Sequence, residues 1–453
     1  MRGGFLQREV ILVEFPWGRD KDPRVPLGHA SLVAMLDKVP NLVCHSIISP
    51  INRNFDIISI ENQILAIQQN SHCRVDLAIG VYVWCEDVIK HLIASARKNG
   101  FKGQIILGGP QISYSQNGLE NIYPEADVFI RGYGEFAIAE LMSNESKIDM
   151  KGVHYAGDDD LCEQTIVDLD LCPSPWLEGI ISLENQDFIR WETQRGCQFS
   201  CGFCQHKEAG SKLPKHNFCL NRIEQEIDLF CNANVKDIAV LDPIFNSSSK
   251  SIEILKRFVE NKFSGRLSLQ CRAEMVTDEF IEAASQLNVR LEFGLQTIHL
   301  EEGRAINRKN NMTKVGQTID KINKAGIEYE ISIIYGLPTQ TLQSFSETVD
   351  WCLEKSVPAI KAFPLMLLRG TDTEKRKEEW GLKSSQDSMP VVIESDTFTF
   401  KEWEMMGSIS QALKDTEYNH PNRIDDLLDI SESYTADISR FIPHRINLPP
   451  TTA

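Results

Sequence analysis

Residues 191–210 read WETQRGCQFSCGFCQHKEAG, and this stretch decides how the rest of the chain is interpreted. Its cysteines Cys197, Cys201 and Cys204 have the spacing C-x3-C-x2-C. Cysteine thiolates are soft ligands that suit iron–sulfur clusters, and a four-iron cluster normally takes four of them. Only three cysteines lie close together here. The spacing therefore predicts a four-iron cluster in which one iron stays open for another ligand.

Two other interpretations of the triplet involve no cluster. The cysteines could be unrelated structural thiols, or they could form half of a zinc site with His206. Zinc sites usually have paired C-x2-C or histidine ligands, so His206 alone is a poor fourth partner. Residues 189–193 are predicted to form a strand that leads into the cysteine loop. A tight triplet directly after a strand favours the cluster.

The stretch resembles the radical S-adenosylmethionine (SAM) superfamily. In that family three cysteines hold a [4Fe-4S] cluster, and the amino and carboxyl groups of SAM chelate the open iron. The resemblance implies that Cys197, Cys201 and Cys204 are the metal ligands and that Phe203 is among the residues that contact SAM. It also implies that the reduced cluster passes one electron to the sulfonium, which generates a deoxyadenosyl radical.

Length and charge restrict the class of protein. A chain of 453 residues is long enough for two or three domains. Its 64 acidic and 47 basic side chains give a formal net charge of −17, which disfavours nucleic acid as a partner. No apolar stretch is long enough to cross a bilayer, and the first residues lack the apolar core of a signal peptide. The 12 scattered cysteines fit a reducing cytosol, so we expect a cytoplasmic protein that does not bind membranes.

The first third of the chain alternates short apolar strands with amphipathic helices. This alternation predicts a doubly wound, Rossmann-like sheet of parallel strands, in which ligands bind beyond the carboxyl ends of the strands. Two loops at those ends are rich in glycine, which either admits a small cofactor or only makes a tight turn. The predicted strands are 10–14, 42–47, 75–83, 104–107 and 128–131.

The strings ILGGPQISY at 106–114 and YPEADVFIRGYGE at 123–135 resemble the cobalamin-binding domain that precedes many radical SAM cores. The resemblance covers most of residues 8–145 and implies cobalamin as a third cofactor. The motif Asp-x-His-x-x-Gly, which supplies a histidine to the cobalt in many such domains, is absent, and we expect His29 to be a helix-capping or surface residue. The residues implied to contact cobalamin are Gly108, Gly109, Pro110, Gly132, Tyr133, Gly134 and Glu135.

The alternation of strands and helices resumes after a stretch of weak periodicity, and the predicted fold class is α/β. We expect a cobalamin-binding-type domain at 1–145, a linker at 146–188, a radical SAM partial barrel at 189–370 and a small α-rich extension at 371–453. Six strand–helix units would make a partial, TIM-like (β/α)6 barrel with its site at the carboxyl ends of the strands. The predicted strands are 189–193, 237–241, 266–270, 290–296, 328–335 and 359–365.

Polar or glycine-containing segments follow several of these strands. Arg272 suits a carboxylate because a guanidinium donates paired hydrogen bonds, and Glu274 suits hydroxyl groups. Taken singly, each such residue could equally be a solvated loop residue or a satisfied barrel-end partner. By resemblance to the family, the residues implied to contact SAM beyond the cysteine loop are Asp242, Asn246, Arg272, Glu274, Gln296, Gly336 and Leu337.

The extension after residue 370 carries little that indicates function. Its apolar residues are expected to pack against the barrel rather than to bind substrate, and the extension could cap the barrel and exclude water. These residues are Phe398, Phe400, Trp403, Met405 and Met406.

The combined resemblance implies a radical SAM enzyme, expected to be a cobalamin-dependent methyltransferase. It is expected to methylate an unactivated carbon or phosphorus of a small-molecule or natural-product substrate. An external electron donor such as flavodoxin or ferredoxin is expected to reduce the cluster. Two alternatives stay open. A cobalamin-independent enzyme with a vestigial first domain could transfer the 3-amino-3-carboxypropyl group of SAM or catalyse a rearrangement, and a non-catalytic cobalamin or iron–sulfur sensor belongs to a different class. The sequence assigns no catalytic acid or base.

Overall fold

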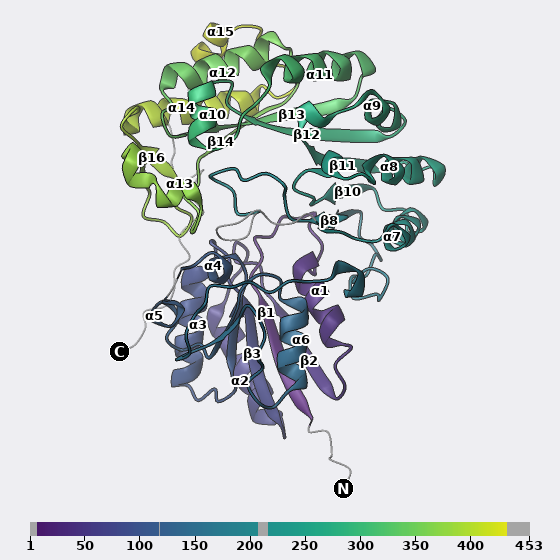
Figure 1. Ribbon diagram of the computed structural model, residues 1–453, viewed down its shortest axis with the longest axis vertical. Helices are drawn as coiled ribbons and strands as arrows, with labels where there is room; N and C mark the ends of the chain where they lie inside the picture. The colour runs from purple at the N-terminus through teal and green to yellow at the C-terminus, as the bar shows by residue number, and fades with distance from the viewer. Residues whose placement is uncertain (1–6, 117, 207–215, 433–453) are drawn as a thin grey trace. The chain divides into compact units, whose positions relative to one another are not determined.

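A computed structural model of the chain describes residues 7–116, 118–206 and 216–432. The chain forms two compact units, one ending at Ser182 and the other beginning at Leu183, and each is built around its own sheet (Figure 1). No helix within the described ranges is both long and apolar enough to span a bilayer. Residues 207–210 of the cysteine stretch and 433–453 of the predicted extension lie outside the described residues.

The first unit contains six strands, which are β1 (Arg8–Glu14), β2 (Leu42–Ile48), β3 (Arg74–Gly80), β4 (Ile105–Gly108), β5 (Val128–Ile130) and β6 (Val153–Tyr155). They form one sheet in the order β2-β1-β3-β4-β5-β6. The first five pair in parallel, which confirms the predicted doubly wound sheet, and β6 pairs antiparallel with β5. β6 lies in the stretch expected to be a linker and was not predicted as a strand. Its three residues are too few to show the alternation of a strand.

Helices cover both faces of this sheet. α1 (Leu27–Leu36) and α6 (Glu135–Ser143) pack together on one face, and α2 (Ile57–Asn70) and α3 (Glu86–Lys98) pack on the other (Figure 1). The short helices α4 (Pro110–Ser113) and α5 (Leu119–Ile122) follow β4. Helices on both faces require right-handed crossovers on each side of β1, which is how a doubly wound sheet is built.

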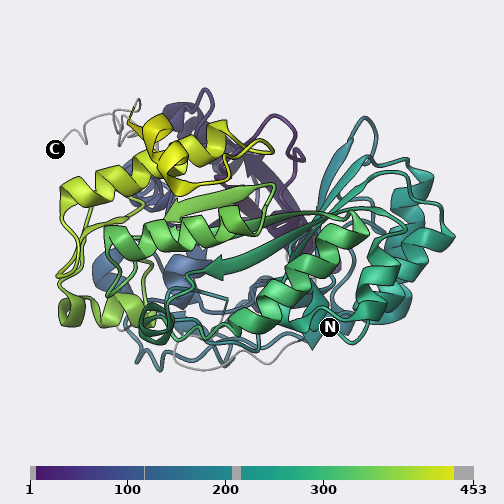
Figure 2. The ribbon, with the colours of Figure 1, turned by 90° about the horizontal axis from the view of Figure 1, so that it is seen from above.

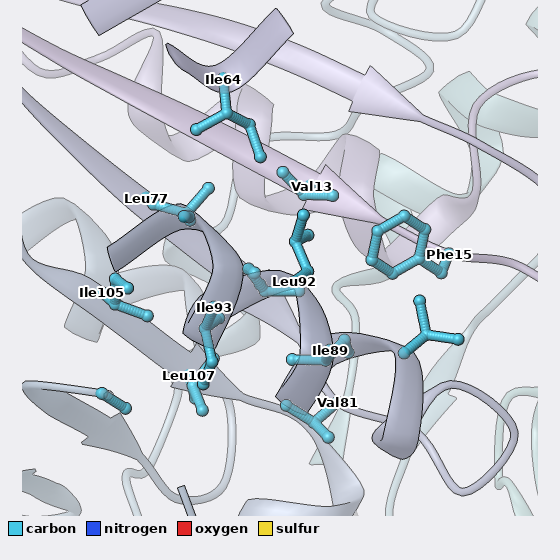
Figure 3. Close-up of a cluster of buried hydrophobic side chains, with 14 of the residues drawn as sticks. Val13, Phe15, Ile64, Leu77, Val81, Ile89, Leu92, Ile93, Ile105 and Leu107 are labelled. Atoms are coloured by element: carbon cyan, nitrogen blue, oxygen red, sulfur yellow. The ribbon is translucent and has the colours of Figure 1, made fainter. Parts of the chain in front are cut away.

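The helix α3 shows why this sheet is buried. Its apolar residues recur at i, i+3, i+4 and i+7, and Ile89, Leu92 and Ile93 are each at most 1% exposed. Figure 3 shows these three side chains in one cluster with strand residues that include Val13 and Leu77. The apolar side chains that the 3.6-residue period places on one side of the helix therefore pack against the apolar strands, and together they form the core on this face.

The second unit contains a parallel sheet whose strands are β7 (Phe188–Trp191), β10 (Asp237–Val240), β11 (Arg266–Cys271), β12 (Asn288–Gln296), β13 (Glu328–Tyr335) and β14 (Ile360–Pro364). Each strand pairs in parallel with the next one along the chain, in the order β14-β13-β12-β11-β10-β7. The crossovers contain α7 (Leu220–Asn232), α8 (Ser251–Glu260), α9 (Asp278–Ala284), α10 (Leu300–Ala305), α11 (Met312–Ala325) and α12 (Leu342–Glu354). Six parallel strands in chain order with intervening helices confirm the predicted architecture. Figures 1 and 2 show the helices α11 and α12 running alongside this sheet.

Burial along β12 shows that this sheet is covered on one face only. Val289, Leu291 and Phe293 are at most 3% exposed, whereas the residues between them are partly exposed. A parallel sheet covered on both faces would show a continuous apolar strand. The alternation therefore indicates an open inner face, as in a barrel whose interior binds ligands.

The extension packs on the second unit. It contains α13 (Asp372–Lys375), the short strands β15 (Lys383–Ser384) and β16 (Val392–Glu394), and the helices α14 (Phe400–Asp415) and α15 (Ile424–Ser431). Trp403 is 1% exposed, and its ring centroid lies 5.9 Å from that of Tyr335. Met406 is fully buried, whereas Met405 is 45% exposed. Most of the predicted apolar cluster thus packs against the barrel.

Candidate functional site

A cavity of about 410 Å³ opens at the carboxyl ends of the strands in the second unit. Side chains from four consecutive strands contribute to its wall, among them Gln270, Glu292 and Ser332. Phe363 on β14 adds an apolar surface and is 53% exposed. The volume lies in the range of pockets that bind small molecules and cofactors.

All three cysteines of the triplet line this cavity. No group of three or more His, Cys, Asp or Glu side chains in the described ranges converges closely enough to hold a single metal ion. A cluster sets a different requirement, because each thiolate binds a different iron and the sulfurs stand further apart. Burial raises the pKa of Cys197, and the positive charges of Arg308 and Arg272 oppose that rise. Cationic side chains therefore lie near the thiolates that a cluster would need.

The start of the cysteine loop is fixed by Asp242, which was predicted to contact SAM. Its carboxylate accepts hydrogen bonds from the backbone N–H groups of Thr193 (2.7 Å) and Gln194 (3.1 Å), and also from the Thr193 hydroxyl. Asp242 is fully buried, which raises its pKa to about 7, and it does not line the cavity. In this structure it braces the end of β7.

Three of the residues predicted to contact SAM do line the cavity, namely Phe203, Arg272 and Gln296. The guanidinium of Arg272 lies 4.1 Å from the ring centroid of Phe199 and forms an ion pair of 3.2 Å with Glu274. Gln296 has a φ of 71°, in the left-handed region that favours glycine, beside the register shift of β12. A non-glycine residue held there is often part of a functional site.

The other residues predicted to contact SAM are not in the cavity wall. Asn246 holds the backbone of Arg272, since its amide donates to the Arg272 carbonyl (3.0 Å) and accepts from the Arg272 N–H (2.9 Å). The N–H groups of Gly336 and Leu337 donate to Oε1 of the buried Gln340, at 2.7 and 3.1 Å. These residues shape the strand ends, and a role in SAM binding stays a prediction.

Several wall residues were missed by the sequence analysis. Arg308 lines the cavity, and its Nη1 donates to the sulfur of Cys201 at 3.7 Å. Glu292 and Ser332 also line it from the inner face of their strands. The strand alternation could have found these two, because they occupy the polar positions of an otherwise apolar strand. Arg308 follows α10 and carries no such signal.

The glycine-rich loops of the first unit lie at the carboxyl ends of β4 and β5. Gly109 has a φ of 91°, and a Cβ there would lie 2.9 Å from the backbone N of Val81. Gly132 has a φ of 84°, and a Cβ there would lie 2.8 Å from the carbonyl of Thr165. Both glycines are therefore required by close backbone approach within the unit itself.

The remaining predicted loop residues flank these glycines. Pro110 begins α4, where its fixed φ suits the first helical position. Gly134 precedes α6, whose first residue Glu135 is 5% exposed, and the Tyr133 carbonyl accepts a hydrogen bond from the Thr165 hydroxyl. The loops thus end at two helix N-termini at the carboxyl edge of the sheet.

The strand after β1 is added on one side of it and β3 is added on the other, so the order of strands reverses between β1 and β3. Ligands of doubly wound sheets bind at such a switch point. Glu14 ends β1, and its carboxyl accepts a hydrogen bond from the hydroxyl of Tyr82, just after β3. The Tyr82 ring stacks on that of Trp84 at 4.7 Å. Burial raises the pKa of Glu14 to about 8. A carboxyl that is mostly protonated at neutral pH therefore lies at the switch point.

The expectation for His29 was wrong. Its ring is 1% exposed, and its Nε2 lies 2.8 Å from the Ser46 hydroxyl. Because apolar residues surround it on α1, burial lowers its pKa to about 4. His29 is an internal residue of the first unit, neither a helix cap nor a surface group.

We predict that Glu14 makes the stability of the protein depend on pH. Its pKa is about 8 in the folded protein and 4.5 when unperturbed, so the folded state retains its proton longer. Its contribution to stability is then fully present below about pH 4.5 and is lost as the pH rises towards 8. Urea unfolding of the wild type and of Glu14→Gln at pH 5, 7 and 9 checks this. The substitution should flatten the decline, and an equal decline in both proteins contradicts the assignment.

Comparison with known proteins agrees with this geometry. Residues 191–352 match the Radical SAM superfamily, so the second unit carries a radical SAM domain. The match confirms the predicted resemblance to the radical SAM superfamily for this part of the chain. A radical SAM domain implies a [4Fe-4S] cluster and SAM as cofactors.

Two curated relatives are methyltransferases. The chain is 25% identical over 351 residues to "Cobalamin-dependent radical SAM methyltransferase TokK" of Streptomyces tokunonensis, covering 70% of this chain and 50% of that protein. It is also 25% identical over 310 residues to "2-(S-pantetheinyl)-carbapenam-3-carboxylate methyltransferase" of Streptantibioticus cattleyicolor, covering 61% of this chain and 44% of that protein. The chain thus spans about half the length of these relatives.

Two solved structures share the fold over most of the chain. The radical SAM methyltransferase TsrM from Kitasatospora setae superimposes with a TM-score of 0.67 at 14% identity, over 88% of this chain and 82% of TsrM. OxsB, a cobalamin-dependent SAM radical enzyme, gives 0.69 at 16% identity, over 94% of this chain and 70% of OxsB. The predicted fold class, with its doubly wound first part and TIM-like core, is confirmed.

Proposed function

We propose that this protein is a cobalamin-dependent radical SAM methyltransferase that acts on a small molecule. One observation carries the proposal. A single chain combines a doubly wound sheet, whose glycine-rich loops lie at its ligand-binding edge, with a parallel-strand unit whose cavity is lined by the cysteine triplet. TsrM and OxsB have the same combination of folds over most of this chain, and both were solved with cobalamin.

The second unit fits a cluster and SAM. Its wall offers three soft thiols, with the cationic Arg308 and Arg272 close to them, and these guanidinium groups suit a carboxylate. The Nε of Arg308 is buried without a hydrogen-bond partner among the described residues, so this guanidinium is not fully satisfied by the protein. Cys197, Cys201 and Cys204 would hold the cluster, and the two arginines would orient SAM. Once bound, the cluster supplies the electron that cleaves SAM, and the corrinoid supplies the methyl group.

The first unit would hold the corrinoid at the carboxyl edge of its sheet, near Gly109 and Gly132. Both glycines lie in loops at the carboxyl ends of β4 and β5, where ligands of doubly wound sheets bind. We expect the corrinoid to take no histidine ligand from this part of the chain. The ring of His29, on α1, is buried and contacts the hydroxyl of Ser46. The absence of the Asp-x-His-x-x-Gly motif supports the same conclusion.

The relatives and the cavity support a small molecule as the substrate. One relative methylates a carbapenam carboxylate by its name, which supports a natural product or another small molecule as the acceptor. The apolar Phe363 beside polar strand residues suits a substrate that has both apolar and polar parts. A flavodoxin or ferredoxin in the cytoplasm would supply the electrons.

Cofactor stoichiometry and SAM products test the proposal. The protein is purified without oxygen from cells supplied with cobalamin, reconstituted with iron and sulfide, and analysed for iron, sulfide and corrinoid per chain. We expect four irons and about one corrinoid, with S-adenosylhomocysteine and deoxyadenosine formed from SAM under reduction. Four irons without corrinoid would favour a cobalamin-independent enzyme, and an intact cluster that never cleaves SAM would favour a sensor.

A further inference from the structure

We infer that residues 306–310, INRKN, form the second half of the cluster site, and that Arg308 sets the reduction potential of the cluster by donating a hydrogen bond to Cys201. Arg308 would be a positioning residue that acts through a ligand. This inference rests on the proposed function, because it requires that the three cysteines hold an iron–sulfur cluster.

The segment is attached to the cysteine loop by its backbone and by a side chain. The N–H of Gly202 donates to the carbonyl of Ile306 at 2.7 Å. The amide of Asn307 donates to the carbonyl of Ser200 at 2.8 Å and reaches its hydroxyl at 2.9 Å. Two successive residues thus bind on either side of the central cysteine. This holds the cysteine loop and the segment together as one structural element.

The third contact places a cation on the cysteine itself. Nη1 of Arg308 lies 3.7 Å from the sulfur of Cys201, which is 8% exposed, and Nη2 donates to the carbonyl of Gly294. The amide of Asn310 donates to the carbonyl of Leu295 at 2.7 Å, which anchors the segment to β12. The guanidinium is therefore fixed by the strand on one side and faces a buried sulfur on the other.

A fixed donor at a ligand sulfur has a defined electrostatic effect. Reduction adds one negative charge to the cluster and its thiolates, and a hydrogen bond or a nearby positive charge stabilises that charge. Hydrogen bonds to the sulfurs are among the factors that set the potential of iron–sulfur clusters. Arg308 should therefore make this cluster easier to reduce than it would be with the cysteines alone.

The test measures the midpoint potential of the cluster in the reconstituted full-length protein, without SAM, corrinoid or substrate. The variants are Arg308→Gln and the matched control Arg304→Gln. Arg304 lies on the adjacent α10, is half exposed and forms an ion pair with Glu301, so its replacement removes the same charge away from the cysteines. EPR-monitored potentiometry reports the fraction of reduced cluster at each potential.

We expect Arg308→Gln to lower the potential and Arg304→Gln to leave it unchanged. The ratio of reduced to oxidised cluster at a fixed potential should fall about tenfold, which is about 59 mV for one electron. An unchanged potential in Arg308→Gln with a full complement of iron overturns the inference. If this variant retains too little cluster, Arg308→Met decides, because methionine fills a similar space without a charge or a hydrogen-bond donor. A lower potential in Arg308→Met supports the inference, and an unchanged one overturns it.

The two possible failures can be told apart. A wild-type protein that binds no iron–sulfur cluster contradicts the proposed function. A wild-type cluster whose potential is insensitive to Arg308 contradicts only the role of this residue. Asn307→Ala adds a further distinction, since losing the amide contact with Ser200 should reduce the cluster content while the potential of the remaining cluster stays near that of the wild type.

Discussion

Replacing Cys201 with serine is expected to abolish cluster binding and SAM cleavage. Cys201 is the central cysteine of the triplet, is 8% exposed and contacts Arg308. A serine hydroxyl is a hard, weakly acidic group and is a poor substitute for a soft thiolate on iron. We expect the iron content to fall towards zero and SAM cleavage to fall by at least about 100-fold.

The matched control for this prediction is Cys231→Ser. Cys231 lies on α7 in the same unit, is partly exposed and does not line the cavity. This variant should retain the iron, the visible absorption and the SAM cleavage of the wild type. Full iron content and cleavage in Cys201→Ser would refute the cluster assignment. Equal losses in both variants would mean that the cysteines act through folding alone.

Replacing Asp242 with alanine is expected to destabilise the second unit by about 3 kcal/mol or more. The substitution leaves three buried donors at Thr193 and Gln194 without an acceptor, and each such donor costs about 1–3 kcal/mol. Because these residues lead directly into the cysteine loop, the cluster content should fall as well. Denaturant unfolding and iron analysis of the same preparation measure both effects.

Asp242→Asn separates bracing from cofactor binding. The asparagine amide keeps one carbonyl acceptor for the backbone N–H groups, so this variant should recover most of the stability and the iron. Asp320→Ala is a suitable control, because the Asp320 side chain is 63% exposed and pairs only weakly with Lys355 at 3.2 Å. If Asp242 instead binds the amino group of SAM, Asp242→Asn would raise the KM for SAM while the stability of both Asp242 variants stayed close to that of the wild type.

Strand and helix periods let the sequence predict most of the fold. The period of two along β12 and the 3.6-residue period along α3 are local properties, since alternate residues or every third and fourth residue must face the core. All eleven predicted strands are present, with ends shifted by a few residues. β6 was missed, because it gains its place only by pairing with β5 on a sheet edge.

The sequence by itself determined the chemistry at the centre of the site. Three cysteines within eight residues must lie together in any fold, because the intervening chain is too short to separate them. The glycines at 109 and 132 are also a local property of the sequence, because their positive φ angles are accommodated easily only by glycine. Spacing along the chain was sufficient for these features.

Only the tertiary structure decided which polar residues face the cavity. Arg308 is more than 100 residues from Cys201 in the sequence, yet its guanidinium contacts the Cys201 sulfur. Asp242 and Arg272 both follow strands, but one side chain turns inward to brace β7 and the other lines the cavity. Strand position brings both to the same edge. The direction of each side chain depends on hydrogen-bond partners that are distant in the sequence, so no local pattern could reveal it.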